Sequence, residues 1–424
     1  MLVVGAGAAG WPAAIGAARQ GARVLLLEED PLPGGAAVDQ FVSMPDGGPI
    51  SGVPAEYLDA LRTRFPLTSR PVDKWWYFWY MPADIVRVVA ELVAAESAIV
   101  PVYGAKARRF TVDGTRVTGV LIDAPEGGER WLKAQVVIDA TGTGALAEEA
   151  GCDVRYGEDA REDFGEAAAP EDRTESVQQC TWMFISQRLP GGDTEWVPRG
   201  LESGYRTPSS HTEAAVLRRG PGVFLHWGCR VDCRDTRDPH ALADAQREGL
   251  VRMGPELDDV RAHGYGVHLA PRIGVREQRR VLGEHVVSAV DMIEGRIPDD
   301  SVLVTQRPID IWRSGHGQMD YPDVRPYGIP YRALVPRGVE GLLVAGKHMS
   351  GTHLAMASYR VQSLLGQLGQ AAGVAAALCA ARNARPRDLD FSLLRPALVA
   401  PPQNLVVRAD KDWVTPPSPQ EGPL

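Results

Sequence analysis

The stretch MLVVGAGAAGWPAAIGAARQGARVLLLEE (residues 1–29) decides the fold of this chain. Three apolar residues lead into the pattern GxGxxG, an Ala-rich segment follows, and a second apolar run, Val24 to Leu27, ends at Glu28. This order predicts a strand, a glycine turn, a helix, a second strand and an acid. Together these elements form a dinucleotide-binding βαβ unit.

Each position of the pattern has a physical task. Gly5 allows the tight turn, Gly7 lets the backbone approach a pyrophosphate, and Gly10 lets the helix pack on the strand. The free N–H groups and the partial positive charge of the helix N-terminus attract phosphates. Glu28 stands 23 positions after Gly5, where an acid accepts hydrogen bonds from a ribose.

Composition limits the possible partners. The chain has 424 residues, enough for two domains or one large composite domain. A net charge of −9 without a Lys/Arg cluster argues against nucleic acid and anionic membranes as partners. No apolar run of spanning length stands out and the first strand leaves no room for a signal peptide, so we expect a cytoplasmic protein. The five cysteines are scattered, which favours reduced, buried thiols over a redox pair or a metal site.

Apolar runs and turn signals predict the later elements. They indicate helices at 55–64 and 83–96 and strands at 99–103, 106–112, 116–123 and 131–138. Residues from about 160 to 325 show no sustained helical period. Gly341–Gly346 predicts another buried strand and Ser358–Ala381 a long helix, whereas the Pro-rich stretch from Ala400 onward predicts a loosely held tail. A strand and a helix from the end of the chain would therefore complete the first βαβ unit.

Five stretches carry a resemblance to a known family. They are the opening stretch with PLPGG after it, VVIDATGTGALAEEAG (136–151), REQRRVLGEH (276–285), IPYRALVP (329–336) and the segment 342–378. In this order they resemble the FAD-dependent oxidoreductases of the glutathione-reductase-like, two-dinucleotide-domain flavoprotein superfamily, and more narrowly a bacterial metabolic family. The resemblance implies FAD as the cofactor. It also implies an α/β fold in which a discontinuous Rossmann-like FAD-binding domain carries an inserted, mixed α+β substrate domain.

The resemblance also implies domain bounds. The FAD-binding domain is expected at 1–40, 83–160 and 326–385, the substrate or cap domain at 41–82 and 161–325, and a C-terminal extension at 386–424.

Cofactor contacts follow from the same resemblance. They fall on the first glycine turn and its acids, a second glycine pair, a strand position whose backbone meets the adenine, the ATG turn, and the turn and helix start beside the flavin: Gly5, Gly7, Ala8, Ala9, Gly10, Glu28, Glu29, Gly34, Gly35, Ala36, Ala107, Thr141, Gly142, Gly346, Lys347, His348, Arg360 and Val361. Thr143 and Ala145 stand where the family commonly has acids, and Lys347 where it often has Arg. These departures put any inherited substrate in doubt but leave FAD binding intact.

The implied reaction is hydride transfer between flavin N5 and a small organic substrate, with an external electron donor or acceptor, and the dehydrogenase or oxidase direction is favoured. The predicted catalytic residues are His353 as a base, Arg360 as a clamp for a carboxylate or carbonyl, and Tyr331. The alternative interpretation is that these side chains satisfy FAD or buried backbone groups. An ene- or fumarate-type reductase and a non-catalytic flavin-binding protein are the alternative functions. A homodimer is left open.

Three further groups have two interpretations each. The aromatic run Trp75–Tyr80 fits a stacking platform for a substrate ring, and equally core packing, which is favoured. For His316, Tyr331 and Arg332, a structural role is favoured over a direct one. Arg276, Arg279 and Arg280 are expected to pair with Glu277 and Glu284 rather than to bind an anion. Three glycines of the last helix are expected to pack closely on the sheet: Gly366, Gly369 and Gly373.

Overall fold

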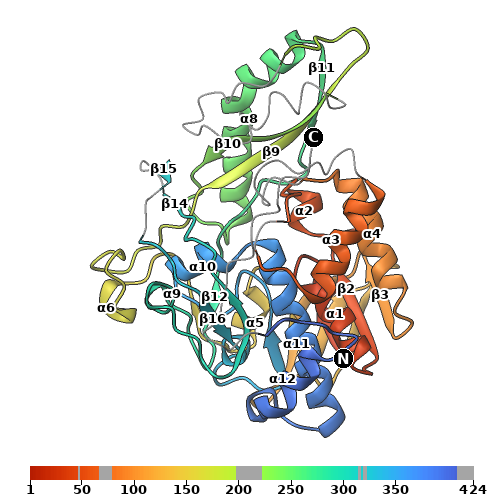
Figure 1. Ribbon diagram of the computed structural model, residues 1–424, viewed down its shortest axis with the longest axis vertical. Helices are drawn as coiled ribbons and strands as arrows, with labels where there is room; N and C mark the ends of the chain where they lie inside the picture. Colours follow the sequence, from red (N-terminus) through yellow and green to blue (C-terminus); the bar gives the residue numbers. More distant parts are fainter. Residues whose placement is uncertain (46–47, 66–78, 197–221, 314–316, 319–321, 408–424) are drawn as a thin grey trace, which may run out of the picture.

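The opening βαβ unit forms the centre of a five-stranded parallel sheet (Figure 1). The strand order is β17 (Leu342–Val344), β7 (Val137–Asp139), β1 (Leu2–Val4), β2 (Val24–Glu28) and β3 (Ile99–Tyr103). The first strand is thus central, and a strand from near the end of the chain forms one edge. The structure is a computed structural model that describes the chain except for residues 46–47, 66–78, 197–221, 314–316, 319–321 and 408–424.

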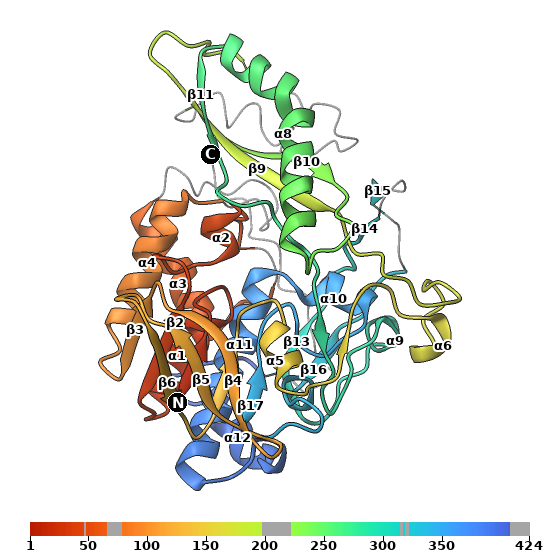
Figure 2. The same cartoon turned by 180° about the vertical axis from the view of Figure 1, so that it is seen from behind.

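Two layers cover this sheet. Helices α1 (Gly10–Arg19) and α11 (Gln362–Arg382) lie on one face, and the antiparallel strands β4 (Lys106–Asp113), β5 (Arg116–Asp123) and β6 (Glu129–Lys133) lie on the other (Figures 1 and 2). The predicted single strand at 131–138 is therefore wrong. It is two strands, because β6 completes the antiparallel hairpin and the chain then crosses into the parallel sheet as β7.

Glycines bring α1 and α11 into backbone contact. A Cβ on Gly369 would lie 2.0 Å from the carbonyl oxygen of Ala9, and one on Gly373 equally close to that of Ala13. Close packing was predicted for these glycines, but against the sheet, whereas their partner is the first helix. The predicted helix at 358–381 is also divided, since α10 (His353–Tyr359) ends before α11 begins.

A second unit projects from the sheet domain and has its own core (Figure 1). It contains β9 (Cys180–Arg188), β10 (Val223–Val231), β11 (Tyr265–Leu269) and the 24-residue helix α8 (Pro239–Ala262). The prediction that this part of the chain lacks a long helix is wrong. The first half of the buried stripe of α8 contains only small residues, which gave little hydrophobic signal; the whole stripe is Ala241, Ala245, Gly249, Met253, Leu257 and Val260.

The remaining elements are α2 (Ala36–Asp39), α3 (Gly52–Arg64), α4 (Pro82–Ala94), α5 (Ala145–Glu149), α6 (Arg161–Phe164), α9 (Ala289–Glu294), α12 (Phe391–Val399), the 3-10 helices Tyr331–Leu334 and Pro386–Asp388, and the strands β8 (Val154–Arg155), β12 (Arg280–Val281), β13 (Ser301–Thr305), β14 (Trp312–Arg313), β15 (Gly317–Gln318) and β16 (Tyr327–Pro330). Helices α3 and α4 lie within three residues of their predicted bounds. Apolar residues between 281 and 324 belong to the core of the sheet domain, whereas 180–273 supply the second core. The predicted domain division stays a prediction.

The expected loose tail is wrong for residues 400–407. Gln403 is buried, accepts a hydrogen bond from the Gln370 amide, and donates one to the carbonyl of Gly16 at 2.8 Å. Leu405 is buried in the same core. This segment therefore fastens α11 to α1. Of the aromatic run, residues 75–78 lie outside the described part of the chain, and Tyr80 is fully buried.

Helix α11 is long and apolar enough to span a membrane, although no apolar run of that length was expected from the sequence. It is instead buried along nearly its whole length inside the protein, as expected for a helix that is apolar all round in a folded core. All five cysteines are buried, as expected, and none of them forms a disulfide.

Candidate functional site

The glycine turn before α1 forms a cradle of backbone N–H groups. Gly5 has a φ of +99°, and a Cβ on Gly10 would lie 1.7 Å from the Gly5 carbonyl oxygen, so both positions require glycine. Among the described residues, the N–H groups of Gly7, Ala8 and Ala9 have no acceptor. Three free donors at a helix N-terminus fit the pyrophosphate of a dinucleotide.

A second glycine pair crosses this turn. Gly35 has a φ of +53°, and a Cβ there would lie 2.8 Å from Cα of Gly7. Gly34 donates its N–H to the carbonyl of Ala6 at 3.0 Å, and Ala36 begins α2 directly afterwards. The predicted contact residues of both segments therefore lie side by side.

Glu28 lies at the end of β2, as predicted. Its carboxylate accepts the N–H of Ala6 at 2.6 Å and that of Asp30 at 3.2 Å, and burial raises its pKa. These bonds fix an acid beside the cradle, where a ribose hydroxyl would be bound. The neighbouring Glu29 points to Arg272, 3.5 Å away.

The ATG turn follows β7 into the same edge of the sheet. Asp139 accepts hydrogen bonds from the N–H of Thr141 at 3.0 Å and from its hydroxyl at 2.7 Å, and Gly142 has a φ of +75°. Thr143, which replaces a family acid, bonds to the Thr141 hydroxyl at 3.1 Å. The substitution therefore keeps the turn closed. Ala107 lies on β4, in the layer that covers the sheet.

The turn after β17 places three predicted contacts together. Gly346 has a φ of +141°, and His348 is fully buried with its Nε2 3.2 Å from Asp139. Lys347 donates its ammonium group to the carbonyl of Val275, and burial lowers its pKa to about 8.

Arg360 and Val361 lie between α10 and α11. The Nη2 atom of Arg360 donates to the carbonyl of Asp310 at 2.9 Å and to Oε1 of Gln178 at 3.3 Å. Burial lowers the pKa of Arg360 to about 10. Val361 is the N-cap of α11, so the positive end of that helix begins at the predicted place.

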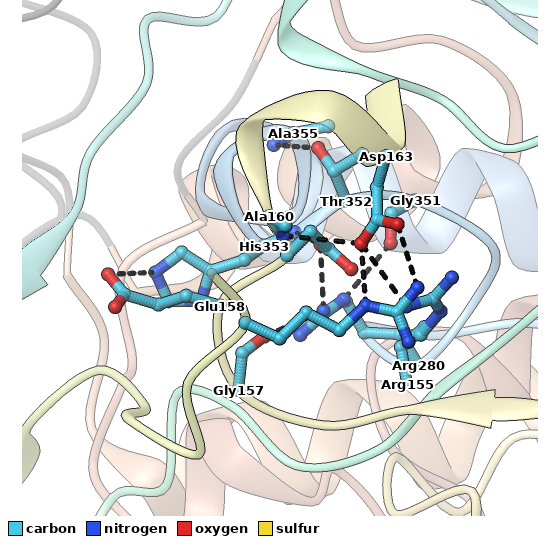
Figure 3. A network of polar contacts seen from close by, with 12 residues as sticks. Arg155, Gly157, Glu158, Ala160, Asp163, Arg280, Gly351, Thr352, His353 and Ala355 are labelled. Carbon is cyan, nitrogen blue, oxygen red and sulfur yellow. Dashed lines mark hydrogen bonds and ion pairs between the residues drawn. The ribbon is translucent and has the colours of Figure 1, made fainter. Parts of the chain in front are cut away.

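His353 is the first residue of α10 and lies in a buried polar network (Figure 3). Its Nδ1 is 2.9 Å from the Glu277 carboxylate, and its N–H donates to Asp159 at 2.8 Å. Its Nε2 is buried, lies 3.9 Å from Glu158, and has no hydrogen-bond partner among the described residues. The ring is thus oriented by one carboxylate and faces a second.

Arg280 is the central cation of this network, and its side chain is 1% exposed. It bonds to Glu277, to Asp159 at 3.0 Å and to the carbonyls of Gly157 and Gly351 (Figure 3). The pairing with Glu277 was predicted. Asp159 was missed, because it lies in an acid-rich stretch that reads as a solvated loop.

The other predicted pairings differ. Arg279 bonds to Glu148, and Glu284 lies 3.4 Å from Arg387. Arg276 donates to the carbonyl of Gln179 at 2.6 Å and to the hydroxyl oxygen of Thr181 at 2.5 Å.

Tyr331 lies apart from His353 and Arg360. Its buried hydroxyl donates to the carbonyl of Pro386 at 2.9 Å, so it fastens the C-terminal segment. Arg332 pairs with Asp300 at 2.9 Å, which agrees with the favoured structural role. His316 lies outside the described residues. The structure therefore brings two of the three predicted catalytic residues to opposite ends of α10.

Solved structures give only distant likenesses. The myxobacterial chondrochloren halogenase CndH is 13% identical, with a TM-score of 0.43, and the match covers 93% of this chain and 77% of that one. A geranylgeranyl bacteriochlorophyll reductase-like protein from Thermoplasma acidophilum is also 13% identical, with a TM-score of 0.43 and coverages of 93% and 81%. Such likenesses assign no substrate or reaction to this chain.

No curated protein sequence matches the chain. The family profile described as "FAD dependent oxidoreductase" matches residues 1–398, nearly the whole described chain. The α/β fold, the parallel sheet and the cradle for a dinucleotide agree with that match. The chain belongs to the FAD-dependent oxidoreductases, a family of enzymes that use FAD.

Proposed function

We propose that this enzyme oxidises a small organic molecule, with His353 accepting the proton that leaves the substrate oxygen or nitrogen. The observation that carries the proposal is the buried Glu277–His353 pair, 2.9 Å apart at Nδ1. A carboxylate at Nδ1 holds the imidazole in the tautomer whose Nε2 is a base. That nitrogen has no hydrogen-bond partner among the described residues.

The electrostatic surroundings favour proton uptake. Burial opposes the ionisation of Glu277, but His353 and Arg280 hold its pKa below its ordinary value, so the carboxylate stays charged. Glu158 supplies a second acidic side chain, 3.9 Å from Nε2. Negative charge on both sides of the ring stabilises the imidazolium that forms when the substrate loses its proton.

The cradle and the turn residues hold the cofactor. The N–H groups of Gly7, Ala8 and Ala9 would bind its pyrophosphate, Glu28 its ribose, and the start of α11 the flavin. When bound, FAD supplies the hydride acceptor at N5. Substrate oxidation would break a C–H bond, whose hydride the bound cofactor would accept, and an O–H or N–H bond, whose proton would pass to His353. An external electron acceptor would then be needed to reoxidise the cofactor.

Family membership excludes the non-catalytic alternative. An ene- or fumarate-type reductase would need an acid that gives a proton to carbon. The two carboxylates that face His353 favour the opposite direction, because they hold a proton on the ring once it has arrived.

The test is anaerobic loss of the visible flavin absorption on mixing with alcohols, amines and hydroxy acids. His353→Gln should slow this reduction by roughly a hundredfold, within the range usual for a lost general base. His240→Gln, a change at an exposed histidine, is the matched control. Glu277→Gln should shift the pH profile of the rate. An unchanged rate in His353→Gln, with FAD retained, would overturn the role of His353.

A further inference from the structure

Four cationic side chains converge where the second unit meets α10 and α11. We name Arg276, Arg307, Lys347 and Arg360 the cationic corner. Asp310 lies against this corner. Burial raises the pKa of its carboxyl group, but Arg360, Arg307 and Arg276 are close enough to hold that pKa below its ordinary value. Residues from distant parts of the sequence thus bring positive charge to one place.

Three of these cations donate hydrogen bonds to neutral acceptors. Lys347 donates to the carbonyl of Val275, Arg276 to that of Gln179, and Arg360 to that of Asp310. A neutral carbonyl oxygen accepts a hydrogen bond from these side chains but does not neutralise their positive charge.

Two carboxylates, those of Asp310 and Glu277, lie near these cations. Asp310 is 3.5 Å from Arg360, and Glu277 already pairs with Arg280 and His353. Burial, with Arg276 and Arg307 nearby, lowers the pKa of Arg360 to about 10, and burial, with Arg360 nearby, lowers that of Lys347 to about 8. Each of these two cations therefore lies close to further positive charge.

Two donors in the corner lack acceptors. Nε of Arg360 and Nε2 of Gln178 are buried and have no partner in the part of the chain that the structure describes. Gln178 is only 1% exposed, and its Oε1 accepts from Nη2 of Arg360, so the two side chains lie together. Buried donors without acceptors are costly, and a ligand that supplied the missing oxygens would remove this cost.

Gln178 also connects the corner to the proposed base. Its backbone N–H donates to the Glu277 carboxylate at 3.2 Å, and Glu277 orients His353. The unpaired donors and the oriented imidazole are therefore held by one chain of contacts.

We propose that the substrate carries a carboxylate, bound by Nε of Arg360 and the Gln178 amide and attracted by the cationic corner. The inference rests on the proposed function for the reaction, but the binding site stands on its own contacts. Two N–H donors suit the two oxygens of a planar carboxylate, and a guanidinium binds this group better than an ammonium does.

The probes are acetate, butyrate and benzoate, each compared with its uncharged amide, on the holoenzyme. Binding is read from perturbation of the flavin spectrum and from the melting temperature. The carboxylates should bind and the amides should not. Arg360→Gln and Gln178→Glu should each weaken carboxylate binding by roughly tenfold to a hundredfold. Gln178→Glu is nearly isosteric and places an acid beside Arg360, so it competes for the same donors.

Arg130→Gln, a change at an exposed arginine, is the control and should leave carboxylate binding unchanged. Equal binding of acids and amides, or tight binding of inorganic phosphate alone, would overturn the proposal. Loss of FAD in Gln178→Glu and Arg360→Gln would overturn it too, since the corner would then serve the cofactor. Carboxylate binding together with a failure of hydroxy acids and amino acids to reduce the flavin would instead overturn only the proposed reaction.

Discussion

Two buried charged regions meet at Glu277 and differ in what they lack. In the acid-rich network around Arg280 and His353, the carboxylates of Glu277, Asp159 and Glu166 all accept hydrogen bonds. In the cationic corner, Nε of Arg360 and, beside it, Nε2 of Gln178 have no acceptor among the described residues. The first region joins α10 to β12. The second region offers unpaired donors to a bound molecule. Burial alone therefore does not indicate a binding site, whereas buried donors without acceptors do.

The largest expected effect separates the two regions by stability. Arg280→Gln would leave Glu277 and Asp159 buried without their cation, which costs about 3–5 kcal/mol of unfolding free energy. Arg360→Gln removes a cation whose charged form is disfavoured by burial and by Arg276 and Arg307, and it should cost less than about 1 kcal/mol. Urea unfolding of both holoenzymes measures the difference. Equal losses would contradict the distinction.

A smaller effect is expected from Thr352, which belongs to the acid-rich network. Its hydroxyl oxygen caps α10 by accepting from the N–H of Ala355 at 3.1 Å, and the hydroxyl donates to Glu166 at 2.6 Å. Thr352→Val should lower the unfolding free energy by about 1–2 kcal/mol. Thr352→Ser keeps both bonds and is the control. If Thr352→Ser is as unstable as Thr352→Val, packing of the methyl group rather than hydrogen bonding decides.

The effect of the cationic corner on the unfolding free energy should also depend on pH. The pKa of Lys347 is about 8 in the folded protein and 10.5 ordinarily, so its burial penalty is full below pH 8 and fades as pH rises towards 10.5. Lys347→Met should therefore be more stable than the parent at pH 7 and lose this advantage by pH 10. Lys133→Met, at an exposed site, should show no such trend. A constant difference between parent and Lys347→Met would show that charge is not the cause.

The smallest effect concerns a thiol close to the corner. A hydrogen bond with Cys180 lowers the pKa of Cys233 to about 7, and burial raises the pKa of Cys229 and Cys379 to about 11. Iodoacetamide at pH 7.5 (roughly 1 unit below the ordinary thiol pKa) should therefore modify Cys233 first, as peptide mass spectrometry can show. Earlier modification of Cys229 would contradict this order and imply that access governs reactivity.

The cradle could be predicted to within a residue or two because its cause is local. Gly5, Gly7 and Gly10 fix a turn whose geometry needs no distant partner, and Glu28 follows from the length of one βαβ unit. Helix α8 could not be found in the same way. Its buried face contains Ala241, Ala245 and Gly249, which pack well against a sheet but scarcely differ from their neighbours in hydrophobicity.

The network and the corner depend on contacts between distant residues, which a single sequence does not show. Arg280 meets Asp159 across 121 positions, and Arg360 meets Gln178 across 182. Each acid or cation alone is typical of a solvated surface. Tyr331 was a catalytic candidate for which a structural role was favoured, and its hydroxyl bonds to the carbonyl of Pro386.

The contact between α1 and α11 has a consequence for synthesis of the chain. Helix α1 is made first, but the surface it needs is formed by Gly369 and Gly373, and Gln403 closes the pair from beyond α11. The second unit, at 180–273, is built mostly from neighbouring segments and can fold on the ribosome while α1 is still without its partner. We therefore expect FAD to bind only after α11 has been synthesised. Nascent chains stalled before residue 362 should contain no bound flavin.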